Sequence, residues 1–109
     1  MKIVAFFNLR KKADINKFND EVIKNQIKIF KNKLPKMSNF QVFKLVDSDN
    51  YINLPQIIQI FDWGGTAEEW RETLKSFQYT KDKDIKKITK DWLNFCENDS
   101  TQIIYAKEF

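Results

Sequence analysis

The sequence predicts an α+β fold in which a four-stranded antiparallel sheet is combined with three helices. Two observations support this prediction. Four short segments are rich in β-branched and aromatic residues, which favour strands. Three other segments repeat apolar residues every three or four positions, which is the spacing of an amphipathic helix.

The first strand is predicted at residues 2–9 (KIVAFFNL). Because this segment alternates and lacks a small-residue cleavage site, we interpret it as a strand and not as a signal peptide. A helix over residues 14–34 follows, with Asp14 as its N-cap. Pro35 ends this helix, because the residue before a proline is pushed out of the α region.

The second and third strands are predicted at residues 40–46 (FQVFKLV) and 56–63 (QIIQIFDW). A capping box should follow, because Thr66 and Glu69 stand three apart before an apolar helical run. In this motif the Thr66 hydroxyl accepts from the Glu69 amide, and the Glu69 carboxylate reaches back to the Thr66 amide. Gly64 and Gly65 are expected to supply the unusual backbone angles of the corner. A phosphate-binding loop is not expected, since the residues that complete its motifs are missing.

The third helix is predicted after Tyr79, with Thr80 or Asp82 as its N-cap. Cys96 borders its apolar face and is expected to be a buried, inert thiol. Residues 101–109 (TQIIYAKEF) form the last predicted strand. The order β-α-β-β-α-α-β is the split βαβ pattern of ferredoxin-like sheets. A chain of 109 residues is expected to form one domain, residues 1–109.

The strands lack the apolar–polar alternation of a sheet with one face in water. We assign the purely aliphatic residues, such as Ile3, Ile58 and Ile60, to a face covered by the helices. The other face is then aromatic with isolated amides, and is too apolar to be left in water. The simplest cover is a second copy of the chain, which gives a homodimeric α/β barrel closed by two sheets. A monomer with an open aromatic sheet, as in RNA-recognition domains, is the alternative, but the third strand lacks the motif of that family.

The composition argues against several other classes of protein. The net charge of +4 comes from lysines interleaved with acids along the helices, so no nucleic-acid partner is expected. No apolar run is long enough to span a bilayer, and no membrane partner is expected. The single cysteine permits no internal disulfide, which is typical of the reducing cytoplasm.

Candidate catalytic residues are scarce. The chain contains no histidine, which removes the commonest general base and haem ligand and most zinc sites. Asp47, Asp49 and Asn50 lack the glycine and glutamate that complete a calcium loop. We therefore predict no metal and no cofactor, and the residues leave open whether the protein is an enzyme.

A small-molecule pocket is predicted on the inner face of the sheet, because a few amide and hydroxyl groups stand there on an aromatic surface. The candidate ligand-binding residues are Asn8, Gln59, Tyr105, Phe6, Phe61 and Trp63. The same residues are equally consistent with a filled dimer interface.

The sequence also resembles the dimeric α/β-barrel superfamily, and within it the REDY-like HapK family. The similar stretches are residues 7–9 leading into 13–14, residues 34–42, and residues 92–95 before the last strand. The resemblance implies a homodimer that binds a hydrophobic or aromatic small molecule. It further implies assistance to condensation or cyclisation in the biosynthesis of pyrrole-type pigments, a branch of secondary metabolism. The alternatives are a non-catalytic interaction protein and a small cofactor-free monooxygenase.

Overall fold

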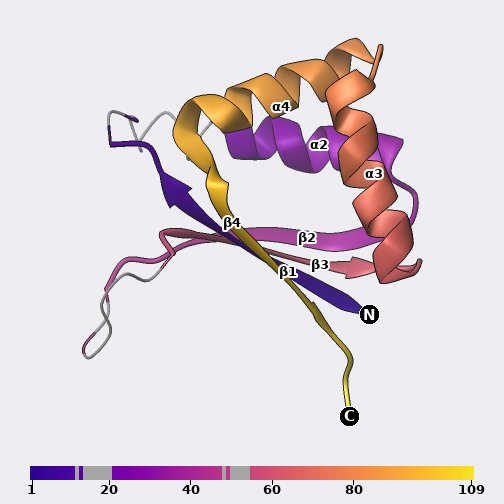
Figure 1. The fold of residues 1–109 in the computed structure, drawn as a ribbon, viewed down its shortest axis with the longest axis horizontal. Helices are drawn as coiled ribbons and strands as arrows, with labels where there is room; N and C mark the ends of the chain where they lie inside the picture. The colour runs from indigo at the N-terminus through magenta and orange to yellow at the C-terminus, as the bar shows by residue number, and fades with distance from the viewer. Residues whose placement is uncertain (12, 14–20, 48, 50–54) are drawn as a thin grey trace.

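The computed structural model of the chain describes residues 1–11, 13, 21–47, 49 and 55–109 (Figure 1). Four strands and three helices lie in this part of the chain, in the predicted order. They are β1 (Lys2–Leu9), α2 (Ile23–Lys33), β2 (Met37–Lys44), β3 (Ile57–Trp63), α3 (Ala67–Tyr79), α4 (Lys83–Phe95) and β4 (Cys96–Ala106). The predicted N-cap Asp14 lies outside the described residues.

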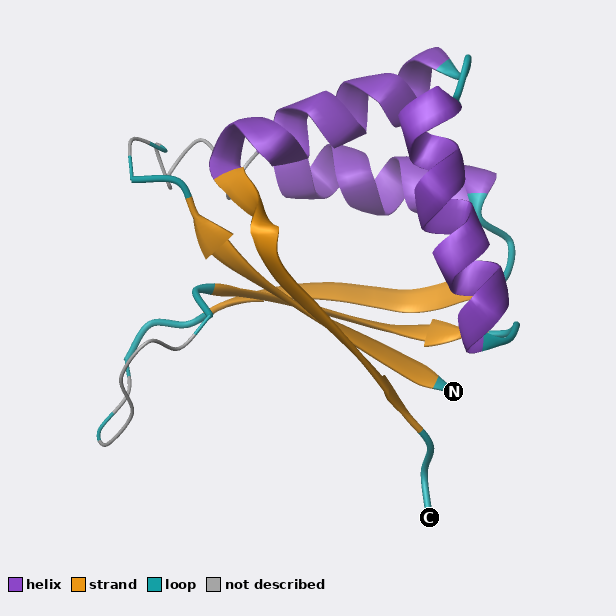
Figure 2. Cartoon of the chain, viewed as in Figure 1, coloured by secondary structure: helices purple, strands orange, loops and turns teal. Residues whose placement is uncertain are grey.

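The four strands form one antiparallel sheet in the order β2-β3-β1-β4. Strand β4 begins at Cys96, directly after α4, and is therefore longer than the predicted 101–109 at its N-terminal side. All three helices lie on one face of the sheet, and the opposite face carries no element of the described chain (Figure 2). This arrangement confirms the predicted α+β class.

The helices bury a core of large apolar side chains against the sheet. One cluster joins Ile3 and Phe61 of the sheet to Phe30 of α2, Trp70 of α3 and Ile88 of α4. A second, smaller cluster surrounds Ile57, Trp92 and Cys96 near the junction of α4 and β4. Because each helix places its apolar stripe in this core, the amphipathic spacing in the sequence accounts for the helix positions.

The assignment of strand faces was correct for β1 and wrong for β3. Ile3 and Ala5 are buried under the helices as predicted, and they lie opposite Phe61 and Gln59 in the register. Residues directly opposite each other in an antiparallel pair share a face. Phe61 and Gln59 therefore face the helices, whereas Ile58 and Ile60 lie half-buried on the open face. Aromatic side chains fill the wide space under helices, so aliphatic character alone did not identify the helix-facing side.

A bulge in β2 was not predicted. The register between β2 and β3 shifts between Ser38 and Gln41, and Asn39 has a positive φ of 52°. Asparagine is enriched among the few non-glycine residues that adopt this left-handed conformation. The extra residue places Phe40 on the helix side, where its ring lies 5.3 Å from that of Phe30.

The N-terminus of α3 follows the capping-box prediction in its first half. The Thr66 hydroxyl accepts from the Glu69 amide at 3.1 Å. The Glu69 carboxylate is held mainly by Lys36, and this pair, with a smaller contribution from the Thr66 amide, lowers the pKa of Glu69. The carboxylate thus ties α3 to the start of β2.

Gly64 and Gly65 were predicted to supply unusual backbone angles at this corner. That prediction was wrong, because neither glycine has a positive φ. Gly65 is instead required for space. A Cβ at Gly65 would lie 2.9 Å from Trp63 Nε1 and would also meet the Glu69 carboxylate, whereas a Cβ at Gly64 would have no neighbour closer than 3.5 Å.

We expect Gly65→Ala to lower the free energy of unfolding by roughly 1–3 kcal/mol, the usual cost of overpacking. Gly64→Ala is the matched control. It should be neutral or stabilising by up to about 1 kcal/mol, since alanine restricts the unfolded chain. Urea denaturation of the two variants measures the difference, and equal effects would contradict the steric explanation.

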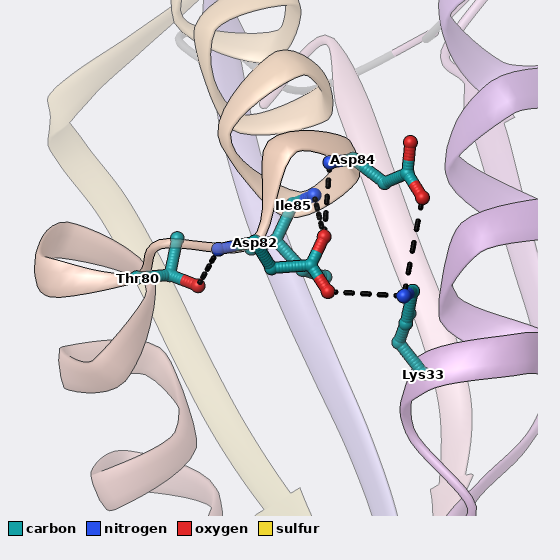
Figure 3. Close-up of polar contacts among 5 residues, drawn as sticks. All are labelled: Lys33, Thr80, Asp82, Asp84 and Ile85. Atoms are coloured by element: carbon teal, nitrogen blue, oxygen red, sulfur yellow. Dashed lines mark hydrogen bonds and ion pairs between the residues drawn. The ribbon is translucent and has the colours of Figure 1, made fainter.

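Helix α4 is capped by Asp82, the second of the two predicted candidates. Its Oδ1 accepts from the amides of Asp84 and Ile85 at 2.9 and 3.1 Å, and the Asp82 amide donates to Thr80 Oγ1 (Figure 3). Lys33, at the end of α2, reaches Asp82 Oδ2 at 3.0 Å and Asp84 at 3.9 Å. The Ile85 amide, Lys33 and the Asp84 amide together hold the pKa of Asp82 below its ordinary value.

The pKa of Asp82 is lower in the folded state than in the unfolded chain, where it is about 3.9. The ionised carboxylate therefore stabilises the fold at pH values above about 3.9, and this stabilisation is lost as the pH falls through the folded-state pKa. We expect Asp82→Ala to unfold at lower urea concentration than wild type at pH 7, with the gap closing as the pH falls below about 4. Asp82→Asn keeps a good N-cap but loses the ion pair, so its urea midpoint at pH 7 should lie between those of the wild type and Asp82→Ala. A gap that stays constant down to pH 3 would contradict the role of the carboxylate.

Candidate functional site

A cavity of about 330 Å³ lies between the three helices and the sheet. This volume is at the lower end of the range for ligand-binding pockets. Its walls are mainly apolar, and aromatic rings come from every helix and from three of the strands. The aromatic lining residues are Phe7, Phe30, Phe40, Phe61, Trp70, Phe77 and Trp92.

The aromatic walls are held by edge-to-face and stacked contacts. The Phe61 and Trp70 rings meet edge-to-face with centroids 4.8 Å apart, and Phe30 stacks on Phe77 at 6.1 Å. On the other side, Phe7 and Trp92 meet edge-to-face at 4.8 Å. Such pairs contribute beyond their buried area and fix ring orientation. The cavity is therefore a shaped space suited to an apolar, flat molecule.

Two buried amides line this cavity and pair with each other. Gln59 of β3 donates through Nε2 to Oε1 of Gln26 on α2 at 3.3 Å, and the two residues are 7% and 4% exposed. Among the described residues this is the one hydrogen bond that either amide makes. Since each amide has two donors and an acceptor, the pair has further capacity to bind a polar ligand atom.

Gln26 was missed in the sequence although a signal for it exists. Val22, Gln26 and Phe30 follow one another at four-residue steps, and all three are buried. A polar residue in the middle of a helix's apolar stripe indicates a buried hydrogen bond or a binding group.

The mouth of the cavity is marked by its exposed lining residues. Lys75 and Gln78 of α3 and Leu93 of α4 are exposed, and Thr101 of β4 is half-buried beside them. Lys75 is the one titratable side chain among the described residues that line the cavity, and it forms no ion pair with them. The site thus has an apolar interior, two central amides and a cation at its entrance.

The six predicted ligand-binding residues lie on opposite faces of the sheet. Gln59 and Phe61 line the cavity. Trp63 and Tyr105 also face the helices but pack in the core, where Tyr105 lies under the Arg71 guanidinium at 4.9 Å. Phe6 and Asn8 belong to the opposite face. The prediction that all six share one face was wrong, because β3 and β4 pair with β1 in the opposite phase from that assumed.

The open face contains a half-exposed carboxylate, Asp62, between two donors. Lys2 Nζ lies 2.8 Å from Asp62 Oδ1, and Asn39 Nδ2 donates to Oδ2 at 2.7 Å. The Asn39 bond, followed by the Lys2 pair, holds the pKa of Asp62 below its ordinary value. A carboxyl that stays ionised in this way is poorly suited to act as a general acid.

Cys96 is buried, as predicted, at the junction of α4 and β4. It is 1% exposed, and burial raises the pKa of its thiol to about 12, although the nearby Arg10 acts in the opposite direction. A thiol with so little thiolate at neutral pH is a weak nucleophile and metal ligand.

Neither a metal cluster nor a membrane-spanning helix is found in the described part of the chain. No three His, Cys, Asp or Glu side chains come together there as metal ligands would. None of the described helices is long and apolar enough to cross a membrane.

Comparison with solved structures finds proteins with a similar architecture. A protein from Bacteroides fragilis, described as dimeric, of unknown function and of ferredoxin-like fold, superposes with a TM-score of 0.58, covering 94% of this chain and 90% of that one. Its identity to this chain is 10%. The chain has a ferredoxin-like fold.

Two other structural neighbours cover almost the whole chain. At3g17210 from Arabidopsis thaliana superposes with a TM-score of 0.68 at 18% identity, covering 99% of this chain and 94% of that one. An ethyl tert-butyl ether D (EthD) family protein from Bacillus halodurans superposes with a TM-score of 0.54 at 16% identity, covering 99% of this chain and 97% of that one. No family model and no curated protein matches the sequence. The REDY-like resemblance stays a prediction, since none of these three structures is described in those terms.

Proposed function

We propose that the protein is a homodimer in which each protomer binds a hydrophobic or aromatic small molecule in the cavity between its helices and its sheet. The observation that carries the ligand proposal is the cavity with aromatic walls that the buried Gln26–Gln59 pair also lines. Buried amides are costly unless they are hydrogen-bonded, so their position in a cavity wall favours a site over a filled core.

The dimer proposal rests on the open face of the sheet. Val4, Phe6, Ile58 and Ile60 form a half-buried apolar centre, and Phe43 and Ile104 beside them are 47% and 49% exposed. A continuous apolar surface of this kind is typical of an interface. The description of the Bacteroides fragilis neighbour as dimeric supports a second copy as the partner.

The resemblance to the REDY-like family supports a finer proposal, assistance to condensation or cyclisation in pyrrole-type pigment biosynthesis. With one titratable side chain among the described lining residues, the protein would act mainly by enclosing and orienting a reactive molecule. The reducing cytoplasm is the proposed compartment, because the single cysteine forms no internal disulfide.

Native mass spectrometry of the protein as purified tests both parts together. We expect a mass of roughly twice 13.1 kDa, plus a reproducible small adduct. Thr89→Trp, which fills the cavity from α4, should lose the adduct, whereas the neighbouring surface variant Lys90→Trp should keep it. A monomer would refute the dimer, and an adduct retained by Thr89→Trp would refute the cavity as its site.

A further inference from the structure

Trp70 carries a buried hydrogen-bond donor that has no partner. The residue is 5% exposed and lines the cavity, and its indole Nε1–H forms no hydrogen bond among the described residues. The contrast with Trp63 is direct, because Trp63 Nε1 donates to the Thr66 carbonyl at 2.9 Å. An unpaired buried donor is costly, and buried polar groups are paired in the great majority of cases. A ligand oxygen that reaches the enclosed Nε1 from the cavity would supply the missing acceptor.

The polar groups around the cavity are mostly donors or can act as donors. The described lining contains three glutamine amides, two threonine hydroxyls, the Trp70 indole and the Lys75 ammonium, and it contains no carboxylate. An indole N–H and an ammonium can only donate. A lining of this composition favours a ligand rich in acceptors, and the one formal charge favours an anion.

The two donor-only groups lie at different depths on the same helix. Trp70 and Lys75 are five residues apart on α3, which corresponds to about 7.5 Å along the helix axis. Trp70 is buried, whereas Lys75 is exposed at the mouth. The two residues are also about 140° apart around the helix, but both line the cavity. A ligand that reaches both would meet the indole at its inner end and the ammonium of the long lysine side chain at its outer end.

We propose that the cavity binds a flat organic anion whose inner end presents an oxygen to Trp70 Nε1–H and whose anionic group lies beside Lys75. This inference rests on the proposed small-molecule function and names the ligand class. Trp70 sets the preference for an oxygen at the inner end, and Lys75 sets the preference for a negative charge at the outer end.

Three naphthalenes of the same ring size separate these preferences. In 6-hydroxy-2-naphthoate both groups are present, 2-naphthoate lacks the inner oxygen, and 6-hydroxy-2-naphthamide lacks the charge. Isothermal titration should give about fivefold weaker binding for 2-naphthoate, the effect of one hydrogen bond. The amide should bind about threefold more weakly, because the ion pair with an exposed lysine is modest.

Matched variants assign each preference to its residue. Trp70→Phe should bind 6-hydroxy-2-naphthoate and 2-naphthoate equally, and Lys75→Met should no longer distinguish acid from amide. Lys86→Met, an exposed lysine of α4 outside the cavity lining, should behave as wild type. Preferences that survive both substitutions would overturn the proposal.

Indole signals in a ¹⁵N–¹H spectrum of the wild-type protein give a test that does not depend on the folding of any variant. On addition of 6-hydroxy-2-naphthoate, the Trp70 indole proton should move downfield as it gains an acceptor, while the Trp63 signal stays near its position. A Trp70 signal that responds equally to 2-naphthoate would overturn the assigned contact. If the three compounds bind equally, the ligand class is wrong but the cavity stands; if neither they nor naphthalene itself bind, the proposed function fails.

Discussion

Ile60→Glu is expected to convert the proposed dimer of about 26 kDa into a monomer. Ile60 lies at the centre of the open sheet face, opposite Val4 in the neighbouring strand. In an interface between two copies with twofold symmetry, each substitution appears twice and the two carboxylates come close together. An unpaired buried charge costs several kcal/mol, and each 1.4 kcal/mol raises the dissociation constant of the dimer about tenfold.

Sedimentation velocity over a concentration series measures this change directly. Ile27→Glu is the control, because Ile27 is an exposed isoleucine of α2 on the other side of the molecule. This variant makes the same change of side chain away from the open face, so it should leave the proposed dimer intact. A wild-type monomer, or an Ile60→Glu protein that remains dimeric, would refute the open face as the interface.

Gln59→Leu is expected to destabilise each protomer by about 1–3 kcal/mol, although it replaces a polar core residue with an apolar one. The substitution leaves the buried Gln26 amide without its partner at 3.3 Å, and a buried polar group without a partner costs its full desolvation energy. Gln26→Leu alone should have a similar cost for the same reason. The double variant removes both amides and should recover most of the lost stability.

Urea unfolding of the four proteins forms a double-mutant cycle that measures this coupling. A coupling near zero, with the two single costs simply adding, would show that the amides act independently. The same variants can be used in ligand-binding measurements, since loss of both amides should preserve the shape of the cavity but remove the polar contacts that these two residues make with a ligand.

Much of the fold was predictable because local rules agree with the tertiary structure. The strand Lys2–Leu9, the helix start at Thr66 and the cap at Asp82 all depend on residues close in sequence. Their signals are side-chain periodicity and hydrogen bonds within one helical turn. The order of elements followed from these, and the order limits an antiparallel sheet to few topologies.

The candidate site was predicted only in part, because it depends on pairing between strands distant in sequence. Gln59 and Phe61 were selected as binding residues, yet the register with β1 places them under the helices and not on the open face. Moving a strand by one residue exchanges its two faces, and apolar residues on both sides of β3 gave no sign of the correct phase.

The sequence by itself determined the class of fold, the positions of most strands and helices, and the excess of apolar surface on the sheet. These are properties of residue type and spacing along the chain. Only the tertiary structure decided which face of β3 the helices cover, that Gln26 meets Gln59, and that Trp70 Nε1, in the wall of a cavity, has no partner in the described part of the chain. The physical reason is that burial and hydrogen bonding at these positions arise between residues far apart in sequence, whose contacts depend on how the helices pack on the sheet.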